Sequence, residues 1–165
     1  MSEVDELIAD LERGHAGTPW HGPSRAVVLA DVSAEEAAWA PPGSVHSIWE
    51  IVLHMTAWTN EVARRLLGGV PDYPAAGDWP PVPTLATEAE WAHAMAALND
   101  AHQDLIATLR GIKSVSLAEL IGNISDGQLG TRVSHAAMVR GIAQHDAYHT
   151  GQIAILKKLF RNRLN

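Results

Sequence analysis

The sequence predicts an all-α protein, a four-helix bundle with long inter-helix loops, in which residues 1–165 form a single domain. The main observation is that apolar residues recur at helical spacing in four long stretches, whereas the alternation typical of strands is not found. The composition agrees, because an apolar fraction of 47% and a charged fraction of 19% over 165 residues are typical of a globular domain with one core.

The first helix is expected over residues 3–13, where apolar side chains line one face at i, i+3, i+4, i+7 spacing. Glycines and prolines then interrupt the chain before a short apolar segment at residues 24–30. Residues 33–36, Ser-Ala-Glu-Glu, have the pattern of a capping box and predict a brief helical turn. The Pro-Pro-Gly sequence of residues 41–43 ends it.

The second helix is expected from Ser44 or Ser47 to about Leu67, where two glycines follow as a stop signal. Residues 68–86 contain so many prolines and glycines that they predict a long loop and not a regular element. A loop of this length in a compact domain is typically functional.

The third helix is expected over residues 87–111, opening with a capping box of Thr87 and Glu90. Residues 112–131 are compatible either with a short helical turn plus a loop or with a small hairpin. The last and longest helix is expected over residues 134–161. The long connections allow an up-and-down order or one long crossover.

The charge and the absence of cysteine narrow the function classes. A formal net charge of −7 argues against a nucleic-acid partner, which needs basic groups clustered on one face. The basic residues near the C-terminus, Lys157, Lys158, Arg161 and Arg163, are expected to complement the negative end of the last helix. Without cysteine, any metal ion must be held by nitrogen and oxygen atoms.

Neither a membrane partner nor an export signal is expected. The acidic N-terminus lacks the basic and apolar regions of a signal peptide, and no apolar run approaches the ~20 residues that a membrane span needs. The expected location is therefore the cytoplasm.

Three of the nine histidines carry the candidate chemistry. His145 and His149 are four residues apart on the last helix, so both imidazoles can reach one ion, although such pairs are usually exposed to solvent. Their helix is one of the less polar ones, and both fall near its apolar side. His54 lies in an apolar run of the second helix, where it either joins them or donates to a carbonyl oxygen or to Glu50.

Three histidines on two helices predict a divalent metal site whose fourth position is open to water or substrate, as in catalytic zinc sites. Four residues are near enough in sequence to accept a hydrogen bond from a ligand imidazole or to add a ligand: Glu50, Glu61, Asp146 and Gln152. Glu50 or Asp146 is also a candidate catalytic base. Imidazole accepts several metals, among which we expect Zn²⁺ or Ni²⁺.

The remaining histidines are expected on the surface, in packing contacts or at most beside a pocket: His15, His21, His46, His93, His102 and His135. His46 lies too far along its helix from His54 to share the same ion. Trp79, in the long loop, is expected either to form a wall over the metal or to pin the loop to the bundle.

The arrangement resembles the DinB-like family of bacterial four-helix metal proteins. The likeness lies in residues 47–58, in Asp-Trp-Pro at 78–80, and above all in the H-x-x-x-H segment of residues 145–156. It implies that the ligands are His54, His145 and His149 and that the chain forms a homodimer. Some members look like transferases or isomerases that use low-molecular-weight thiols, and others are described as metal-dependent hydrolases.

Together these features lead to one main hypothesis and two alternatives. The main hypothesis is an enzyme whose metal activates water or a low-molecular-weight thiol, for hydrolysis of a small molecule or for transfer to it. The first alternative is a non-catalytic metal-binding or small-molecule-binding bundle whose ion is structural. The second is a helical interaction protein with incidental histidines.

Overall fold

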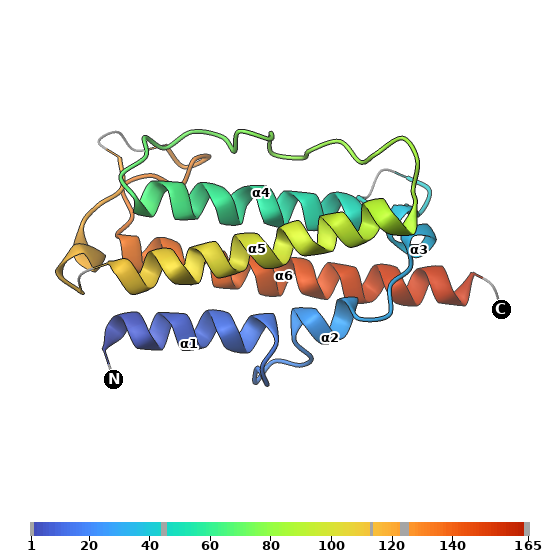
Figure 1. The fold of residues 1–165 in the computed structure, drawn as a ribbon, viewed down its shortest axis with the longest axis horizontal. Coiled ribbons are helices and arrows are strands. Elements are labelled where there is room, and N and C mark those ends of the chain that lie inside the picture. The colour runs from blue at the N-terminus through green and yellow to red at the C-terminus, as the bar shows by residue number, and fades with distance from the viewer. Residues whose placement is uncertain (1, 44–45, 113, 123–125, 164–165) are drawn as a thin grey trace.

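The computed structural model describes residues 2–43, 46–112, 114–122 and 126–163, and Figure 1 shows them as a bundle of helices. Four helices are long: α1 (Glu3–His15), α4 (Ile48–Leu66), α5 (Glu88–Gly111) and α6 (His135–Asn162). Three are short: α2 (Arg25–Leu29), α3 (Ala34–Ala38) and the 3₁₀ helix η1 (Ser114–Ala118). The predicted all-α bundle is confirmed, with α2 and α3 inserted in the first connection.

One long crossover joins the halves of the bundle. In Figure 1, α1 and α6 run in one direction, and α4 and α5 run in the other. Because α4 and α5 are parallel neighbours, residues 68–86 must return along the whole length of α4, roughly 28 Å at 1.5 Å per residue. This decides between the two orders that the sequence allowed, and it explains why the loop is long.

Two of the expected capping boxes form only in part. Ser33 and Thr87 each accept a hydrogen bond from the backbone three residues on, as predicted. The glutamates do not close the boxes. Glu36 instead accepts from Arg161 at 2.9 and 3.1 Å, while the Thr87 N–H donates to a carbonyl of the preceding loop. Thus the pattern locates the helix start, but the partner of the carboxylate depends on the tertiary structure.

The segment that the sequence left open contains elements of both alternatives. The helix η1 supplies the short helical turn. An isolated antiparallel bridge then joins Leu120 to Ser134, supported by a hydrogen bond of 2.9 Å from Ile121 N to Val133 O. Within the described residues this bridge does not extend into a hairpin; Lys113 and residues 123–125 of the segment lie outside them.

Three of the four basic residues near the C-terminus, Lys157, Arg161 and Arg163, form ion pairs with acidic residues of the segment that contains α2 and α3. Lys157 lies 2.6 Å from the carboxylate of Asp31, and Arg163 lies 3.1 Å from that of Glu35. These ion pairs hold the α2–α3 segment against the end of α6, which is a different role from neutralising the helix end.

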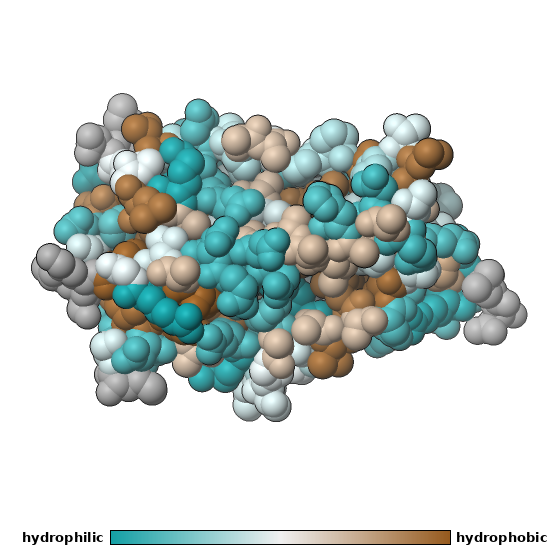
Figure 2. All heavy atoms as spheres, in the orientation of Figure 1, coloured by the Kyte–Doolittle hydropathy of each residue, from teal (hydrophilic) through white to brown (hydrophobic). Residues whose placement is uncertain are grey.

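The surface is mixed in character. Figure 2 shows hydrophilic residues interspersed with smaller apolar patches on the face drawn. In the described part of the chain, no helix combines the length and the apolar composition that crossing a membrane would require.

The core consists of two apolar clusters. One gathers side chains of α1, η1, the end of α4, the end of α5 and the start of α6. The other gathers side chains of α2, α3, the starts of α4 and α5, and the later part of α6. Six polar side chains at the histidine site and around Arg25 are wholly or largely buried, and we call them the polar layer: Arg25, His54, His102, His145, Asp146 and His149.

Candidate metal centre

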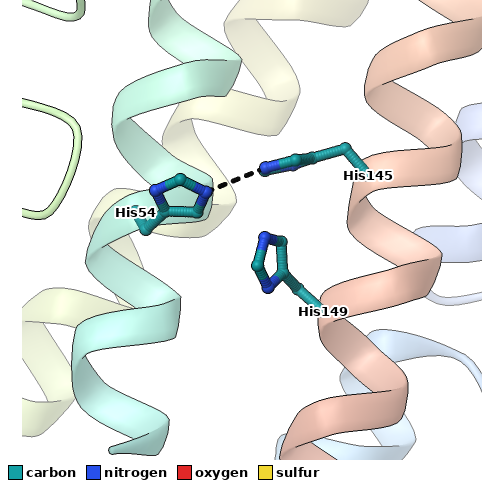
Figure 3. A group of neighbouring side chains, drawn as sticks. All are labelled: His54, His145 and His149. Carbon is teal, nitrogen blue, oxygen red and sulfur yellow. Dashed lines mark hydrogen bonds between the residues drawn. The ribbon is translucent and has the colours of Figure 1, made fainter. Parts of the chain in front are cut away.

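The structure brings together His54 of α4 with His145 and His149 of α6 (Figure 3). One ring nitrogen from each residue lies within 4.8 Å of those of the other two, and the Nε2 atoms of His54 and His145 are 2.9 Å apart. His54 and His149 are buried, while His145 is partly exposed. The three predicted ligand residues therefore meet at one point between the two helices.

Local helix geometry explains why His145 and His149 lie close together. Residues four apart on an α-helix lie one above the other on the same face, and the rings of His145 and His149 are accordingly 4.4 Å apart between centroids. The position of His54 depends on the tertiary structure. Packing of α4 against α6 brings the His54 ring to within 5.0 Å of both.

The Nδ1 atoms of His54 and His149 each donate a hydrogen bond to an oxygen atom. His54 Nδ1 donates to the backbone carbonyl of Asp78 at 2.6 Å, and His149 Nδ1 donates to the Gln152 side-chain oxygen at 2.6 Å. Because these oxygens only accept, each Nδ1 carries the proton and each Nε2 keeps its lone pair. This is the arrangement by which outer partners orient metal-ligating histidines. The expectation for Gln152 is met, whereas no feature of the sequence predicted the contact with the Asp78 carbonyl.

Trp79 lines the histidine cavity and also pins its loop to the bundle. Its ring stacks on His54 at 4.0 Å and on His46 at 3.4 Å, so it covers one face of a candidate ligand and pins the loop to the start of α4. The neighbouring Asp78 side chain accepts a hydrogen bond from Trp58 Nε1 at 2.7 Å. The sequence did not predict that His46 stacks on Trp79 or that Trp58 binds Asp78. The feature of the sequence that pointed to this loop was its Asp-Trp-Pro segment.

Asp146 faces away from the three-histidine cavity. One carboxylate oxygen lies 2.5 Å from Arg25, which is itself buried, and the residue lines a second cavity on another side of α6. The other oxygen lies 3.8 Å from His145 Nδ1, and neither atom has a hydrogen bond in the described structure. Asp146 is thus placed beside a candidate ligand, but not where a substrate in the histidine cavity would lie.

Glu50 is engaged at the start of α4. Its carboxylate accepts from the Ser47 N–H at 2.7 Å, and Ser47 Oγ accepts from the Glu50 N–H at 3.1 Å, which forms a complete capping box. Burial would raise the pKa of Glu50, but the hydrogen bonds that Ser47 donates to its carboxylate lower it below its usual value. Glu50 does not line the cavity, so the geometry gives it a capping role.

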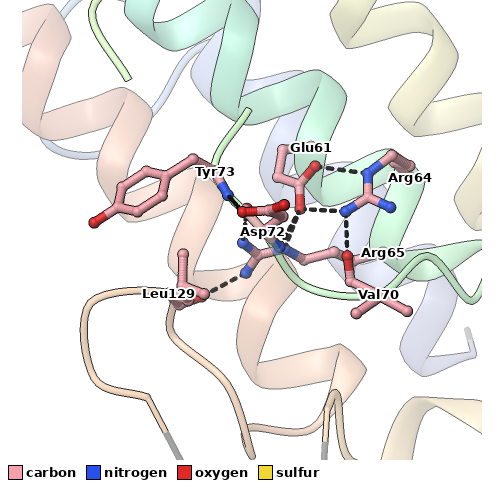
Figure 4. Close-up of polar contacts among 7 residues, drawn as sticks. All are labelled: Glu61, Arg64, Arg65, Val70, Asp72, Tyr73 and Leu129. Carbon is pink, nitrogen blue, oxygen red and sulfur yellow. Dashed lines mark hydrogen bonds and ion pairs between the residues drawn. The ribbon is translucent and has the colours of Figure 1, made fainter. Parts of the chain in front are cut away.

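Glu61 anchors the crossover loop and is not close to the histidines (Figure 4). It is buried between two arginines, accepting from Arg64 at 2.7 and 2.8 Å and from Arg65 at 2.7 Å. Arg65 also donates to the backbone carbonyls of Asp72 and Leu129 at 2.8 and 2.5 Å. Burial would raise the pKa of Glu61, but the arginine hydrogen bonds lower it, so the carboxylate is ionised and holds both guanidinium groups.

The histidines line a cavity of about 980 Å³. Aromatic side chains form much of its wall: Trp58, Tyr73, Trp79 and Tyr148. Among the described residues that line it there is no lysine or arginine, and the only carboxylate is that of Asp78. A mostly apolar cavity with a few convergent polar groups is typical of a small-molecule site.

Burial keeps two of the candidate ligands, His54 and His149, neutral by lowering the pKa of each ring. It lowers the pKa of His149 to about 4, with a further contribution from nearby His145. Burial also lowers the pKa of His54, although the Asp78 carbonyl partly opposes this. Neutral imidazoles are the form that binds metals, so at neutral pH these two rings present lone pairs without first losing a proton.

The donor set fits a divalent ion. Four-coordinate zinc with nitrogen ligands at 2.0–2.1 Å needs ligand atoms about 3.3 Å apart, and the observed separations, from 2.9 Å to no more than 4.8 Å, bracket this value. Within the described residues no carboxylate or fourth histidine joins the group. Three protein ligands would leave at least one coordination position open.

Comparison with known protein families finds a match that covers most of the chain. A model of the DinB superfamily matches residues 24–153, a stretch that contains His54, His145 and His149 and leaves out α1. No curated protein and no solved structure matches the chain.

Replacing Gln152 tests the hydrogen bond to His149. In Gln152→Ala, His149 loses the acceptor that fixes its tautomer and ring orientation, so the affinity for Zn²⁺ should fall by about 10- to 100-fold. Competition with a chromogenic chelator measures this. Gln144→Ala, an exposed position on α6 without such a contact, is the control and should bind like wild type. Equal affinity of both variants would contradict the assigned role.

Replacing Glu61 tests the anchor of the crossover. Glu61→Ala leaves the buried Arg65 without its carboxylate, and the free energy of unfolding should fall by about 3–5 kcal/mol. Urea unfolding of the chelator-treated protein measures it. Glu12→Ala removes an exposed ion pair with Arg110 and should cost less than about 1 kcal/mol. Similar small losses in both variants would show that the anchor is not important for stability.

Proposed function

The chain belongs to the DinB superfamily, and from that premise we propose that it is a divalent-metal-dependent enzyme. It would activate water or a low-molecular-weight thiol, for hydrolysis of a small molecule or for transfer to it. One observation carries the proposal: three imidazole nitrogens converge on one point in the wall of a large cavity. A metal ion held there would have its open coordination position where a small molecule can reach it.

The bound ion would supply Lewis acidity, which lowers the pKa of a water or thiol at its open position toward neutrality. The chain supplies the rest. Asp78 and Gln152 hold His54 and His149 in the tautomer that offers Nε2. Trp79 covers one face of His54 and shields it from solvent. Neither Glu50 nor Asp146 is needed as a base in this proposal, and each already has a structural partner.

The same geometry weighs against a purely structural ion. Structural zinc sites are usually closed by four protein ligands. In the described residues the cluster has three, and Glu50, which could have closed it, caps α4 instead. Because the ligands are imidazoles and the chain has no sulfur donor of the thiolate type, Zn²⁺ or Ni²⁺ is the ion that we propose.

Four further expectations stay predictions. We propose that the protein acts in the cytoplasm and that it forms a homodimer, neither binding nucleic acid nor associating with membranes. Light scattering of the purified chain would measure the oligomeric state.

Metal content tests the site directly. Purified untagged protein, incubated with Zn²⁺ or Ni²⁺ and then desalted, should hold about one ion per chain by plasma mass spectrometry. His54→Ala and His149→Ala should each lose most of it, because two imidazoles bind far more weakly than three. His93→Ala, an exposed histidine of α5, is the control and should keep its ion. A metal-free wild type, or ligand variants that retain the metal, would refute the site.

Activity then separates the enzyme from the metal-stabilised bundle. The loaded protein should turn over in ester-hydrolysis or thiol-conjugation screens, and chelation should abolish the turnover. If chelation lowers the melting temperature but no substrate in either class is turned over, the structural role becomes the better explanation.

A further inference from the structure

The three-histidine cavity extends in one direction along α6. Its α6 lining continues from His149 through Gln152 to Leu159, ten residues or about 15 Å of helix. Ile51, one turn before His54 on the antiparallel α4, lines the same part. We call this extension the apolar arm and define it by its apolar residues: Pro41, Ile51, Ile155, Leu156 and Leu159.

The apolar arm has a buried floor and an exposed rim. Ile51 and Leu156 are buried, whereas Ile155 is 60% exposed and Leu159 is 47% exposed. A narrow substrate group can therefore lie on the buried floor of the arm, beside the exposed side chains of the rim. The floor is continuous with the wall that holds the histidines, so one molecule can occupy the arm and reach the metal position.

The small number of charged residues around the cavity indicates which substrate groups can bind in the arm. The described residues that line the cavity include no lysine or arginine, its only carboxylate, Asp78, already accepts from Trp58, and the ring of His46 is stacked on Trp79. A charged group on the buried floor of the arm would lose water and meet no lysine, arginine or unpaired carboxylate, which is unfavourable. Anionic tails, including the carboxylates of peptide thiols, are therefore poorly suited to it.

We propose that the substrate carries an uncharged aliphatic acyl group, which lies in the apolar arm while its reacting carbonyl lies beside His54, His145 and His149. This inference rests on the proposed function, because it assumes that the reaction occurs at the histidine cluster. It names the part of the substrate that the chain recognises.

A series of hydroxamates tests the arm, since the hydroxamate group chelates an exposed ion and its acyl chain can be varied. Acetohydroxamate, butanohydroxamate, hexanohydroxamate and octanohydroxamate are titrated by calorimetry into Zn²⁺-loaded wild type. Affinity should increase by about two- to fourfold for each added methylene group, as expected for burial of apolar surface. The monohydroxamate of suberic acid has the length of octanohydroxamate but ends in a carboxylate, and it should bind at least tenfold more weakly.

A charge placed on the rim should reverse this preference. Ile155→Lys changes an exposed side chain of the arm, so the fold should persist, and the suberic monohydroxamate should then bind more tightly than octanohydroxamate. Val27→Lys is the matched control, because Val27 is 61% exposed and lies on α2 outside the cavity. It should leave every affinity unchanged. Acetohydroxamate, which is too short to reach the rim, should bind equally to all three proteins.

The outcomes separate the two proposals. If acetohydroxamate does not bind loaded wild type, the open metal position is wrong and the proposed function fails. If acetohydroxamate binds but affinity is independent of chain length, or the charged probe binds as well as the uncharged one, only the acyl-group proposal is overturned. It is also overturned if Ile155→Lys converts a dimer into a monomer by light scattering without changing the preference among probes, because the arm would then be a subunit interface.

Discussion

The rest of the site depends on keeping imidazole rings neutral and oriented inside a bundle of helices. Burial disfavours a protonated ring, and the pKa of His149 falls to about 4 for that reason. A neutral ring still has a donor and an acceptor, and both need partners when water is excluded. His54 and His149 donate their Nδ1–H groups to oxygen acceptors, which leaves the Nε2 atom of each ring as an acceptor. Nε2 of His54 lies 2.9 Å from Nε2 of His145, and a cation would give the three rings a common partner.

The crossover loop follows from the helix order and supplies half of this support. Parallel packing of α4 and α5 requires a connection as long as the helix, and Glu61 and its two arginines hold the first part of that connection in place. The loop then passes the histidines, where Asp78 offers its carbonyl and Trp79 its ring. Loss of the anchor would thus affect both stability and metal binding.

Helix α6 contributes side chains to two sides of the polar layer. His145 and His149 face α4, whereas Asp146 pairs with Arg25 of α2. Farther from the cavity, the buried His102 stacks on His15 at 4.0 Å, and its pKa is lowered to about 4 by burial and by the nearby charges of His15 and Arg25. The adjacent residues His145 and Asp146 therefore line cavities on two different sides of α6.

The sequence by itself determined the features that depend on short-range geometry. Helical periodicity located the four long helices, and the spacing of His145 and His149 placed both rings on one face, because a helix repeats every 3.6 residues whatever surrounds it. The resemblance to the DinB-like family identified His54 as the third ligand, and a model of the DinB superfamily matches residues 24–153. Gln152, three residues after His149, was also within reach of local reasoning.

Only the tertiary structure decided which polar groups meet. Glu50, Glu61 and Asp146 were equally plausible partners of the histidines in the sequence, yet they cap α4, bind Arg64 and Arg65, and pair with Arg25. His54 instead donates to the carbonyl of Asp78, a group that every residue possesses. Such contacts depend on the order of the helices and the path of the loop. Side-chain identity does not encode them, because a carboxylate binds whichever donor the packing brings to it.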